Sequence, residues 1–165
     1  MSKIHESPIQ KLRPTQMTVG MIEVNDKKKH LRSLKANEQR DYMRAHPIPA
    51  VVGAKGLLFI TDHHHLCRAA LEARVATGFF EVEADFSNCD LATFWPEMDK
   101  KRWVHPLDKY GTRHYYSAIP PRLDKLIERL SIPGGVCQKL RRIREDAYSL
   151  RGIRLGRFFP ALHSG

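Results

Sequence analysis

Cysteine, long hydrophobic runs and an apolar leader are the features that this sequence lacks or has little of. Its three cysteines, Cys67, Cys89 and Cys137, lie far apart and form no C-x-x-C pair. Such a sparse, odd set argues against a disulfide scaffold or a zinc ribbon and favours reduced thiols. No run of about 18 apolar residues occurs, and residues 1–14 contain no apolar stretch typical of a secretory signal. We therefore expect a cytoplasmic protein without a membrane partner.

Internal repeats, low-complexity tracts and the patterns of a helix-turn-helix, an RNP motif or a zinc finger are absent as well. Positive charge, in contrast, is abundant, because the 165 residues carry a net charge of +10. Residues 109–165 hold 12 Lys and Arg against 4 Asp and Glu, whereas residues 1–108 hold 16 against 14. This asymmetry is typical of a protein with a polyanionic partner, although a well-solvated basic surface has the same composition. The partner we expect is nucleic acid, bound without direct base readout.

We predict a domain of residues 1–108 followed by a basic, helical extension of residues 109–165. The hydrophobic fraction of 42% is sufficient for one core in a chain of this length. Within the extension, the segment KLRRIRE places four cations within two turns of an expected helix. Clusters of this kind bind phosphate backbones without sequence preference and in a salt-dependent manner. The predicted DNA-binding residues are Lys139, Arg141, Arg142 and Arg144.

Hydrophobic periodicity and turn residues predict alternating helices and strands. The expected strands are 48–53, 57–61 and 79–86, after an extended leader of residues 1–14 at a sheet edge. The expected helices are 15–34, 38–46, 66–77, 91–95 and 122–130, followed by a basic helix over 136–154. Asn37 and Ser87 are expected to cap helices, Gly78 to end one, and Pro96 to break or restart one. This order predicts a small α/β (α+β) domain with a helical basic C-terminal part.

The stretch FITDHHHLCRAALEA, residues 59–73, contains the candidate functional residues. A strand that ends at Thr61 is followed by Asp62, by three histidines and then by a helix. Helix N-termini leave backbone N–H groups unpaired and carry about half a positive charge, which suits phosphate. Histidines there can bind phosphate oxygens or act as general acid–base groups. Asp62 can orient an imidazole, bind Mg²⁺ or abstract a proton.

Two other interpretations of this stretch remain open. Asp62 can serve as an N-cap, with the histidines filling an ordinary polar turn. A transition-metal site is disfavoured, because successive histidine side chains diverge and no cysteine pair or H-x-x-x-H completes a ligand set. Thr15 and Gln16 are similarly ambiguous, since they can cap the first expected helix or contact phosphate.

The segments IPAVVG, AKGLLFITD and HHHLCRAALEA resemble the core box of the ParB-like and sulfiredoxin-like superfamily. There, a strand ends in a D-G-H-H-R or G-C-H-R turn that leads into an alanine-rich helix. The chain is most similar to the branch named for ParB-like nucleases, over residues 11–155. Its matching features are a P-T-Q leader with Gly20, Val24 and Lys27, the pair Phe94-Trp95, and the late segment Asp146, Tyr148, Ser149, Leu150.

The resemblance implies a compact mixed-sheet fold, flanked by helices, that binds nucleotide phosphates at the box. Candidate cofactors are ATP, ADP or CTP, with Mg²⁺ on Asp62. Leu66 stands where arginine is frequent, so the planar fork that binds phosphate is missing at this position, and Arg68 or His63 would have to take its place. The predicted phosphate ligands are His63, Arg68, Thr15 and Gln16, and the predicted catalytic residues are Asp62, His64, His65 and Glu23. Glu23 corresponds to an acidic base in kinase-like relatives, unless it is a solvated glutamate.

The activity that the resemblance implies is binding of, or action on, phosphoesters, as in a DNA-associated nuclease or nucleotide hydrolase. A non-enzymatic DNA-binding or adaptor protein with a degenerate site is the first alternative. A nucleotide-dependent small-molecule kinase is the second. A sulfiredoxin-type reductase is disfavoured, because Cys67 follows the box and none of the box residues is a cysteine.

Overall fold

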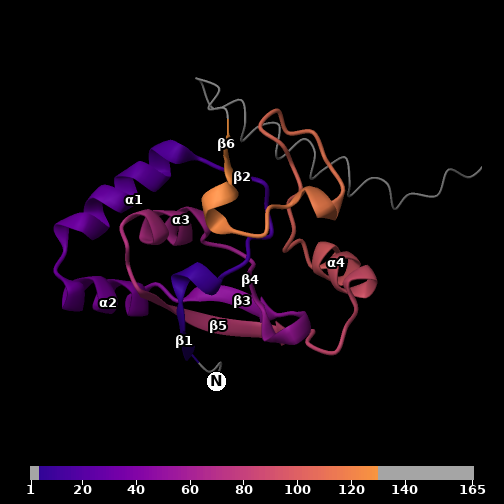
Figure 1. The fold of residues 1–165 in the computed structure, drawn as a ribbon, viewed down its shortest axis with the longest axis horizontal. Coiled ribbons are helices and arrows are strands. Elements are labelled where there is room, and N and C mark those ends of the chain that lie inside the picture. The colour runs from indigo at the N-terminus through magenta and orange to yellow at the C-terminus, as the bar shows by residue number, and fades with distance from the viewer. Residues whose placement is uncertain (1–3, 130–165) are drawn as a thin grey trace, which may run out of the picture. The chain divides into compact units, whose positions relative to one another are not determined.

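A four-stranded mixed sheet lies at the centre of the described part of the chain, residues 4–129 of the computed structural model (Figure 1). Its strands are β1 (Ile4–Pro8), β3 (Ile48–Val52), β4 (Leu58–Ile60) and β5 (Thr77–Asp85). They follow the order β1-β5-β3-β4, in which β5 is antiparallel to β1 and parallel to β3, and β4 is antiparallel to β3. A second sheet pairs β2 (Thr18–Val19) with β6 (Ile127–Glu128) in parallel.

Helices follow the strands in the order that the periodicity predicts. They are α1 (Met21–Ser33), α2 (Ala36–Ala45), α3 (His64–Glu72) and α4 (Leu91–Lys100). Short 3-10 turns lie at Ile9–Lys11, Ala54–Gly56, Tyr116–Ala118 and Leu123–Lys125. Helices α1 and α3 pack on each other and α2 packs on β5, while α4 lies apart from them in Figure 1. The predicted α+β fold with a mixed sheet and flanking helices is confirmed.

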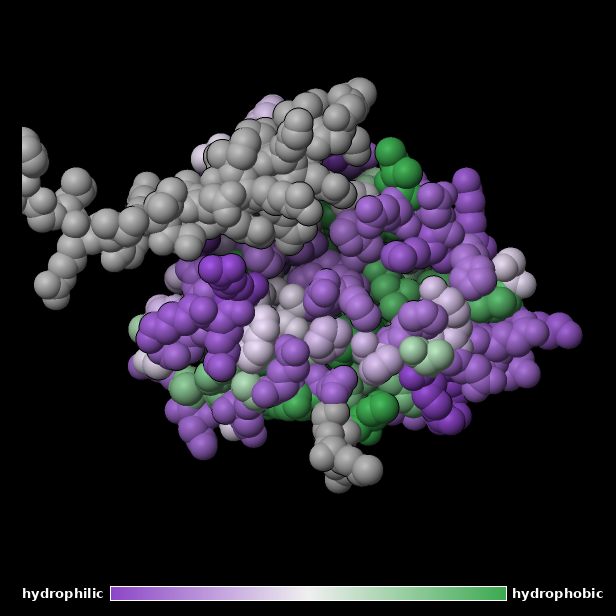
Figure 2. Space-filling view, turned by 180° about the vertical axis from the view of Figure 1, so that it is seen from behind, coloured by the Kyte–Doolittle hydropathy of each residue, from purple (hydrophilic) through white to green (hydrophobic). Residues whose placement is uncertain are grey.

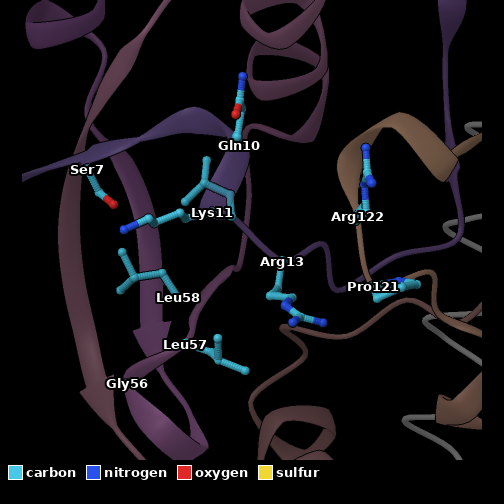
Figure 3. Close-up of a pocket in the computed structure, with 10 residues that line it drawn as sticks. Ser7, Gln10, Lys11, Arg13, Gly56, Leu57, Leu58, Pro121 and Arg122 are labelled. Carbon is cyan, nitrogen blue, oxygen red and sulfur yellow. The ribbon is translucent and has the colours of Figure 1, made fainter.

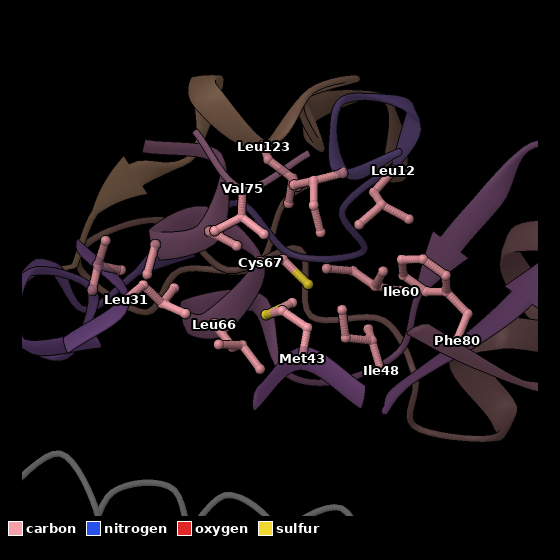
Figure 4. Packing of buried hydrophobic residues seen from close by; sticks show 14 of the residues in the cluster. Leu12, Leu31, Met43, Ile48, Ile60, Leu66, Cys67, Val75, Phe80 and Leu123 are labelled. Atoms are coloured by element: carbon pink, nitrogen blue, oxygen red, sulfur yellow. The ribbon is translucent and has the colours of Figure 1, made fainter. Parts of the chain in front are cut away.

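Two hydrophobic clusters cover the two faces of the sheet. Ala50 belongs to the larger cluster, which α1, α2 and α3 complete. Ile60 points into the same cluster (Figure 4). Val51 and Phe59, their neighbours along the strands, point into the smaller cluster, which Phe94 of α4 helps to form. Successive strand residues face opposite sides of a sheet, so short runs of apolar residues supply both cores.

The first helix begins six residues later than predicted. Residues 18–19 form β2, Gly20 is the N-cap, and α1 starts at Met21. Thr15 and Gln16 therefore do not cap this helix, which corrects one of their two expected roles. The reason is tertiary: residues 15–20 are held by hydrogen bonds to distant segments, so local helix propensity does not decide their conformation.

Gly78 does not end α3, as the sequence had suggested, but lies buried inside β5. The chain leaves α3 through Arg74, which adopts the left-handed conformation with φ 61°. Gly78 is instead required for packing, because a Cβ atom there would lie 2.7 Å from Cδ1 of Ile9. The side chain of Ile48 approaches the same position at 3.2 Å.

Four further predictions about helices are wrong. Lys35, not Asn37, is the N-cap of α2. Asp90, not Ser87, caps α4, because its Oδ1 accepts the N–H of Thr93 at 2.7 Å. Pro96 lies inside α4, which continues through it to Lys100. Residues 122–130 do not form the expected helix: within their described part, a 3-10 turn precedes β6, which is held by pairing with β2.

The described residues beyond 108 continue the same compact unit, which ends at Leu130. Leu123 and Leu126 belong to the larger hydrophobic cluster, so this segment contributes to the main core. The predicted basic helix over 136–154, with Lys139, Arg141, Arg142 and Arg144, lies outside the described residues. Within the described residues, the surface in Figure 2 is mainly hydrophilic with separate hydrophobic patches. No helix among those residues is long and apolar enough to cross a membrane.

Candidate functional site

The turn of residues 62–65 connects β4 to α3 at the edge of the sheet. Thr61 is fixed by its N–H, which donates to the carbonyl oxygen of Pro49 at 3.0 Å. His63 then adopts the left-handed conformation, with φ 60° and ψ 26°, and α3 begins at His64. Asp62 and His63 are exposed, and Oδ1 of Asp62 accepts the N–H of His63 at 2.7 Å. The turn thus presents one carboxylate and one imidazole to solvent.

His64 points the other way, into the protein. Its side chain is buried, and Nε2 accepts the backbone N–H of Thr15 at 3.1 Å. The Thr15 hydroxyl lies 3.3 Å from the same nitrogen and donates to the carbonyl oxygen of Ile60 at 2.7 Å. Thr15 is fully buried as well, so it has no access to a ligand in solution. His64 and Thr15 together fasten the segment before α1 to the end of β4.

Burial lowers the pKa of His64 to about 3, and the nearby imidazoles of His105, His65 and His63 act in the same direction. The ring is therefore neutral at physiological pH, with its Nε2 lone pair engaged by Thr15. A group that binds protons this weakly is poorly matched to acid–base chemistry near pH 7. The geometry gives His64 a structural task, and its predicted catalytic role finds no support in this arrangement.

His65 binds the start of α1. Its Nε2 accepts the N–H of Gly20, the N-cap of α1, at 3.1 Å, and lies 3.4 Å from Oε2 of Glu23. Because the Gly20 N–H requires a lone pair, the ring is neutral and the contact with Glu23 is not an ion pair in this form. A Cβ atom on residue 20 would lie 3.3 Å from Nε2, so glycine permits this close approach.

The electrostatic environment of His65 contains charges of both signs. Partial burial is the main cause that lowers its pKa. Glu23 and Asp62 raise the pKa, whereas Lys27 and Arg129 lower it. Glu23 is exposed on the first turn of α1 and near His65, so the structure brings together these two predicted residues and Asp62. Lys27 and Arg129 add positive charge beside the turn.

Two predicted phosphate ligands are engaged elsewhere. Arg68 donates from Nε to Glu72 at 2.6 Å, and from a terminal nitrogen to the carbonyl oxygens of Leu123 and Leu126 at 3.0 and 3.1 Å. This guanidinium fixes the 3-10 turn before β6 and does not replace the arginine that is missing at residue 66. Gln16 donates to the carbonyl oxygen of Thr18 at 2.8 Å.

His105 belongs to the same neighbourhood, although no sequence pattern had indicated it. Its N–H donates to the carbonyl oxygen of Thr15 at 2.9 Å, and the residue forms an isolated parallel bridge with Gln16. Its imidazole also helps to lower the pKa of His64. Residues 15 and 105 are far apart in sequence, so no local periodicity or spacing carries this signal.

The residues of the turn do not form a metal site of their own. Asp62 is a single exposed carboxylate, one oxygen of which already accepts the N–H of His63. Within residues 4–129, no group of three His, Cys, Asp or Glu side chains is arranged to hold a metal ion. A cation held by protein ligands alone needs more of them than this turn offers, whereas Mg²⁺ can be shared between one carboxylate and the phosphates of a ligand.

The fold and the turn define a small α+β domain whose candidate ligand site lies where a strand passes into a helix. Residues 5–130 match the family described as "Putative ParB-like nuclease", and the chain belongs to this family. The crystal structure of protein Atu1540 from Agrobacterium tumefaciens is similar, with a TM-score of 0.68 and 31% identity over 77% of this chain. That match covers 62% of Atu1540, so this chain spans less than two thirds of its length. No curated protein matches.

Cys67 follows the box but is buried in the larger cluster, and burial raises the pKa of its thiol. The thiolate is the reactive form, so we expect Cys67 to resist alkylation in the folded protein. In a Cys137→Ser variant, a thiol reagent should modify only the half-buried Cys89 before unfolding and both cysteines afterwards. Mass spectrometry of the labelled peptides measures this. Labelling of native Cys67 as fast as Cys89 would contradict the expected burial.

Proposed function

We propose that this ParB-like domain binds the phosphate groups of a nucleotide or a nucleic acid at the turn of residues 62–65. The observation that carries the proposal is the start of α3: among the described residues, no side chain caps this helix, and the residues before it are exposed. The unpaired N–H groups of its first turn form an anion site by themselves. His63 borders this site, and its left-handed conformation turns the chain into the helix.

The surrounding side chains support the same chemistry. Lys27 and Arg129 place positive charge around His65 and favour an anion at the turn. His64 and His65 accept hydrogen bonds from the backbone N–H groups of residues 15 and 20, which fixes the loop that precedes α1. Asp62, an exposed carboxylate at the same turn, repels a bare phosphate.

Binding without catalysis is favoured over phosphoester cleavage by a specific observation. Both Nε2 atoms of His64 and His65 accept backbone N–H groups, so neither nitrogen is free to take a proton from a nucleophile. Phosphoester cleavage or phosphate transfer by this domain would require His63, Asp62 or Glu23 as the base. Incubating the full chain with DNA, ATP and CTP, with and without a small hydroxyl acceptor, separates nuclease, hydrolase and kinase activity from binding alone.

His63→Gly tests the binding site directly. Glycine adopts the left-handed conformation without strain, so the variant should fold at least as well while it loses the imidazole. We expect calorimetric titration with ADP, ATP and CTP to show a fall in affinity of about tenfold, which corresponds to one charge-assisted hydrogen bond. Arg74→Gly is the matched control, because Arg74 is also left-handed and exposed, at the other end of α3.

Asp62→Asn adds a second test of the same proposal. Removing the carboxylate should strengthen nucleotide binding in the absence of Mg²⁺, because like charges at a phosphate site repel. Loss of affinity in His63→Gly but not in Arg74→Gly supports the proposal. Equal affinities in the wild type, His63→Gly and Arg74→Gly would refute it. No binding of nucleotides or of single- and double-stranded DNA would refute it as well.

A further inference from the structure

A separate pocket of about 290 Å³ lies on the outer side of β4, away from the histidine turn. Its walls come from three parts of the chain: residues 7–13, residues 56–58 and residues 121–122. Leu57 and Leu58 supply an apolar surface (Figure 3). Its size lies just below the range of about 300–1,000 Å³ that is typical of small-molecule sites. None of its lining residues belongs to the turn of residues 62–65.

The pocket is lined by three cations and by no acidic residue. Arg122 pairs with Asp124 through two contacts of 2.8 and 3.0 Å. Lys11 and Arg13 are the other two cations of the pocket. Neither of these forms an ion pair with any residue between 4 and 129. In Figure 3, Lys11 extends toward Ser7, whereas Arg13 extends toward the segment that carries Pro121. The positive charge is therefore distributed along the pocket.

Arg13 is the decisive residue, because it is half-buried and yet lacks a carboxylate among the described residues. A partly buried charge without a counter-charge is unfavourable, and an anion from solution relieves that cost. Its backbone is fixed against β4: the N–H of Arg13 donates to Leu58 at 2.8 Å, and its carbonyl oxygen accepts from Ile60 at 3.0 Å. The guanidinium is thus attached to a backbone segment that is fixed at the sheet edge, so little backbone freedom is lost when it binds a ligand.

We propose that this pocket binds a small phosphorylated organic molecule, with Arg13 and Lys11 as the ligands of its phosphate. A guanidinium and an ammonium together match the double negative charge of a phosphate monoester, and the planar fork of arginine binds two of its oxygens. Leu57 and Leu58 provide contact area for the carbon skeleton. Ser7 and Gln10 are the neutral polar groups of the pocket, suited to hydroxyl groups of a sugar.

Ribose 5-phosphate is the probe for this site, with ribose, inorganic phosphate and citrate for comparison. We expect calorimetric titration of the full chain to show binding of ribose 5-phosphate that is stronger than binding of inorganic phosphate, and no binding of ribose. Arg13→Gln and Lys11→Gln should each weaken the binding about tenfold, as the loss of one charge-assisted hydrogen bond implies. Lys29→Gln is the matched control, because it removes one exposed positive charge on α1, outside the pocket.

Each outcome bears on the proposal. Reduced affinity in both pocket variants, with Lys29→Gln unchanged and melting curves alike, supports it. Binding that is equal in Arg13→Gln and wild type, or tighter binding of citrate than of the sugar phosphate, overturns it, as does no binding at all. His63→Gly should leave this binding unchanged, so the result is independent of the histidine turn.

Discussion

Acidification from pH 6.5 toward pH 3 is expected to destabilise the domain by roughly 1.4 kcal/mol per pH unit through His64 alone. The pKa of His64 is lowered to about 3 in the folded state, whereas the unfolded chain retains the ordinary value of 6.5. Between these values the unfolded state binds one proton more than the folded state, so the free energy of unfolding falls as the pH falls. His65 acts in the same direction, because its pKa is also lowered.

Urea unfolding at a series of pH values, followed by the fluorescence of the two tryptophans, measures this slope. Several carboxylates with lowered pKa values, such as Glu72, also lose stabilisation in acid, so the wild-type slope alone does not isolate His64. His64→Gln resolves this, because its amide oxygen can still accept the Thr15 N–H but does not titrate. We expect the variant to be less stable at pH 7 by about 1–3 kcal/mol and to have a shallower slope.

His5→Gln is the control for the loss of one histidine, since His5 is exposed on β1. Its pH dependence should match that of the wild type. If His64→Gln and the wild type showed the same slope between pH 6.5 and pH 4, His64 could not be a buried neutral ring, and the structural role assigned to it would fail.

Gly78→Ala is expected to destabilise the domain by about 1–3 kcal/mol or more, because one methyl group must enter a filled core. The added Cβ would lie 2.7 Å from Cδ1 of Ile9, 3.0 Å from Cζ of Phe80 and 3.2 Å from Cδ1 of Ile48. Real Cβ atoms do not approach neighbours at 2.7 Å, so Ile9 must move or the strand must shift. Thermal and urea unfolding both measure the loss.

A compensating substitution makes this prediction specific to the contact. Ile9→Val removes the Cδ1 atom that the new methyl group would meet, at a cost of about 0.5–1.5 kcal/mol by itself. In the double variant Gly78→Ala/Ile9→Val, the total loss of unfolding free energy should be smaller than the sum of the losses in the two single variants. The difference, which is the coupling energy, should be at least about 0.5 kcal/mol. Strict additivity would show that the clash with Ile9 does not determine the cost.

The sequence predicted the order of elements from α1 to α4 and the position of the strand–turn–helix junction, because hydrophobic periodicity is a local signal. Where each histidine points depends on backbone geometry that periodicity does not encode. The left-handed His63 starts α3 at His64, two residues earlier than predicted. His64 therefore lies within the helix, three residues before Cys67 and on the same buried face. The spacing of three residues from the apolar Cys67 is the signal that would have identified His64 as a core residue.

Other features of the site could not be predicted, because they depend on contacts between distant segments. Gly20 lies within the helix expected over residues 15–34, but it is the N-cap of α1 and is approached by the ring of His65. Arg68 looked like a spare phosphate ligand, and its partners Leu123 and Leu126 come from a segment that was expected to be helical. In each case the deciding partner lies more than 40 residues away, beyond any local pattern.

Thr15 connects its own segment to two others, residues 60–64 and residue 105, which are synthesised later. Its N–H meets His64, its hydroxyl meets Ile60, and its carbonyl meets His105. Contacts over such sequence separations raise the contact order and slow the folding of a domain. The N-terminal segment therefore completes its hydrogen bonds only after residue 105 has been synthesised. Strand β2 completes its pairing only after residue 127 has been synthesised. On the ribosome, this domain closes only after almost all of its described residues have left the exit tunnel.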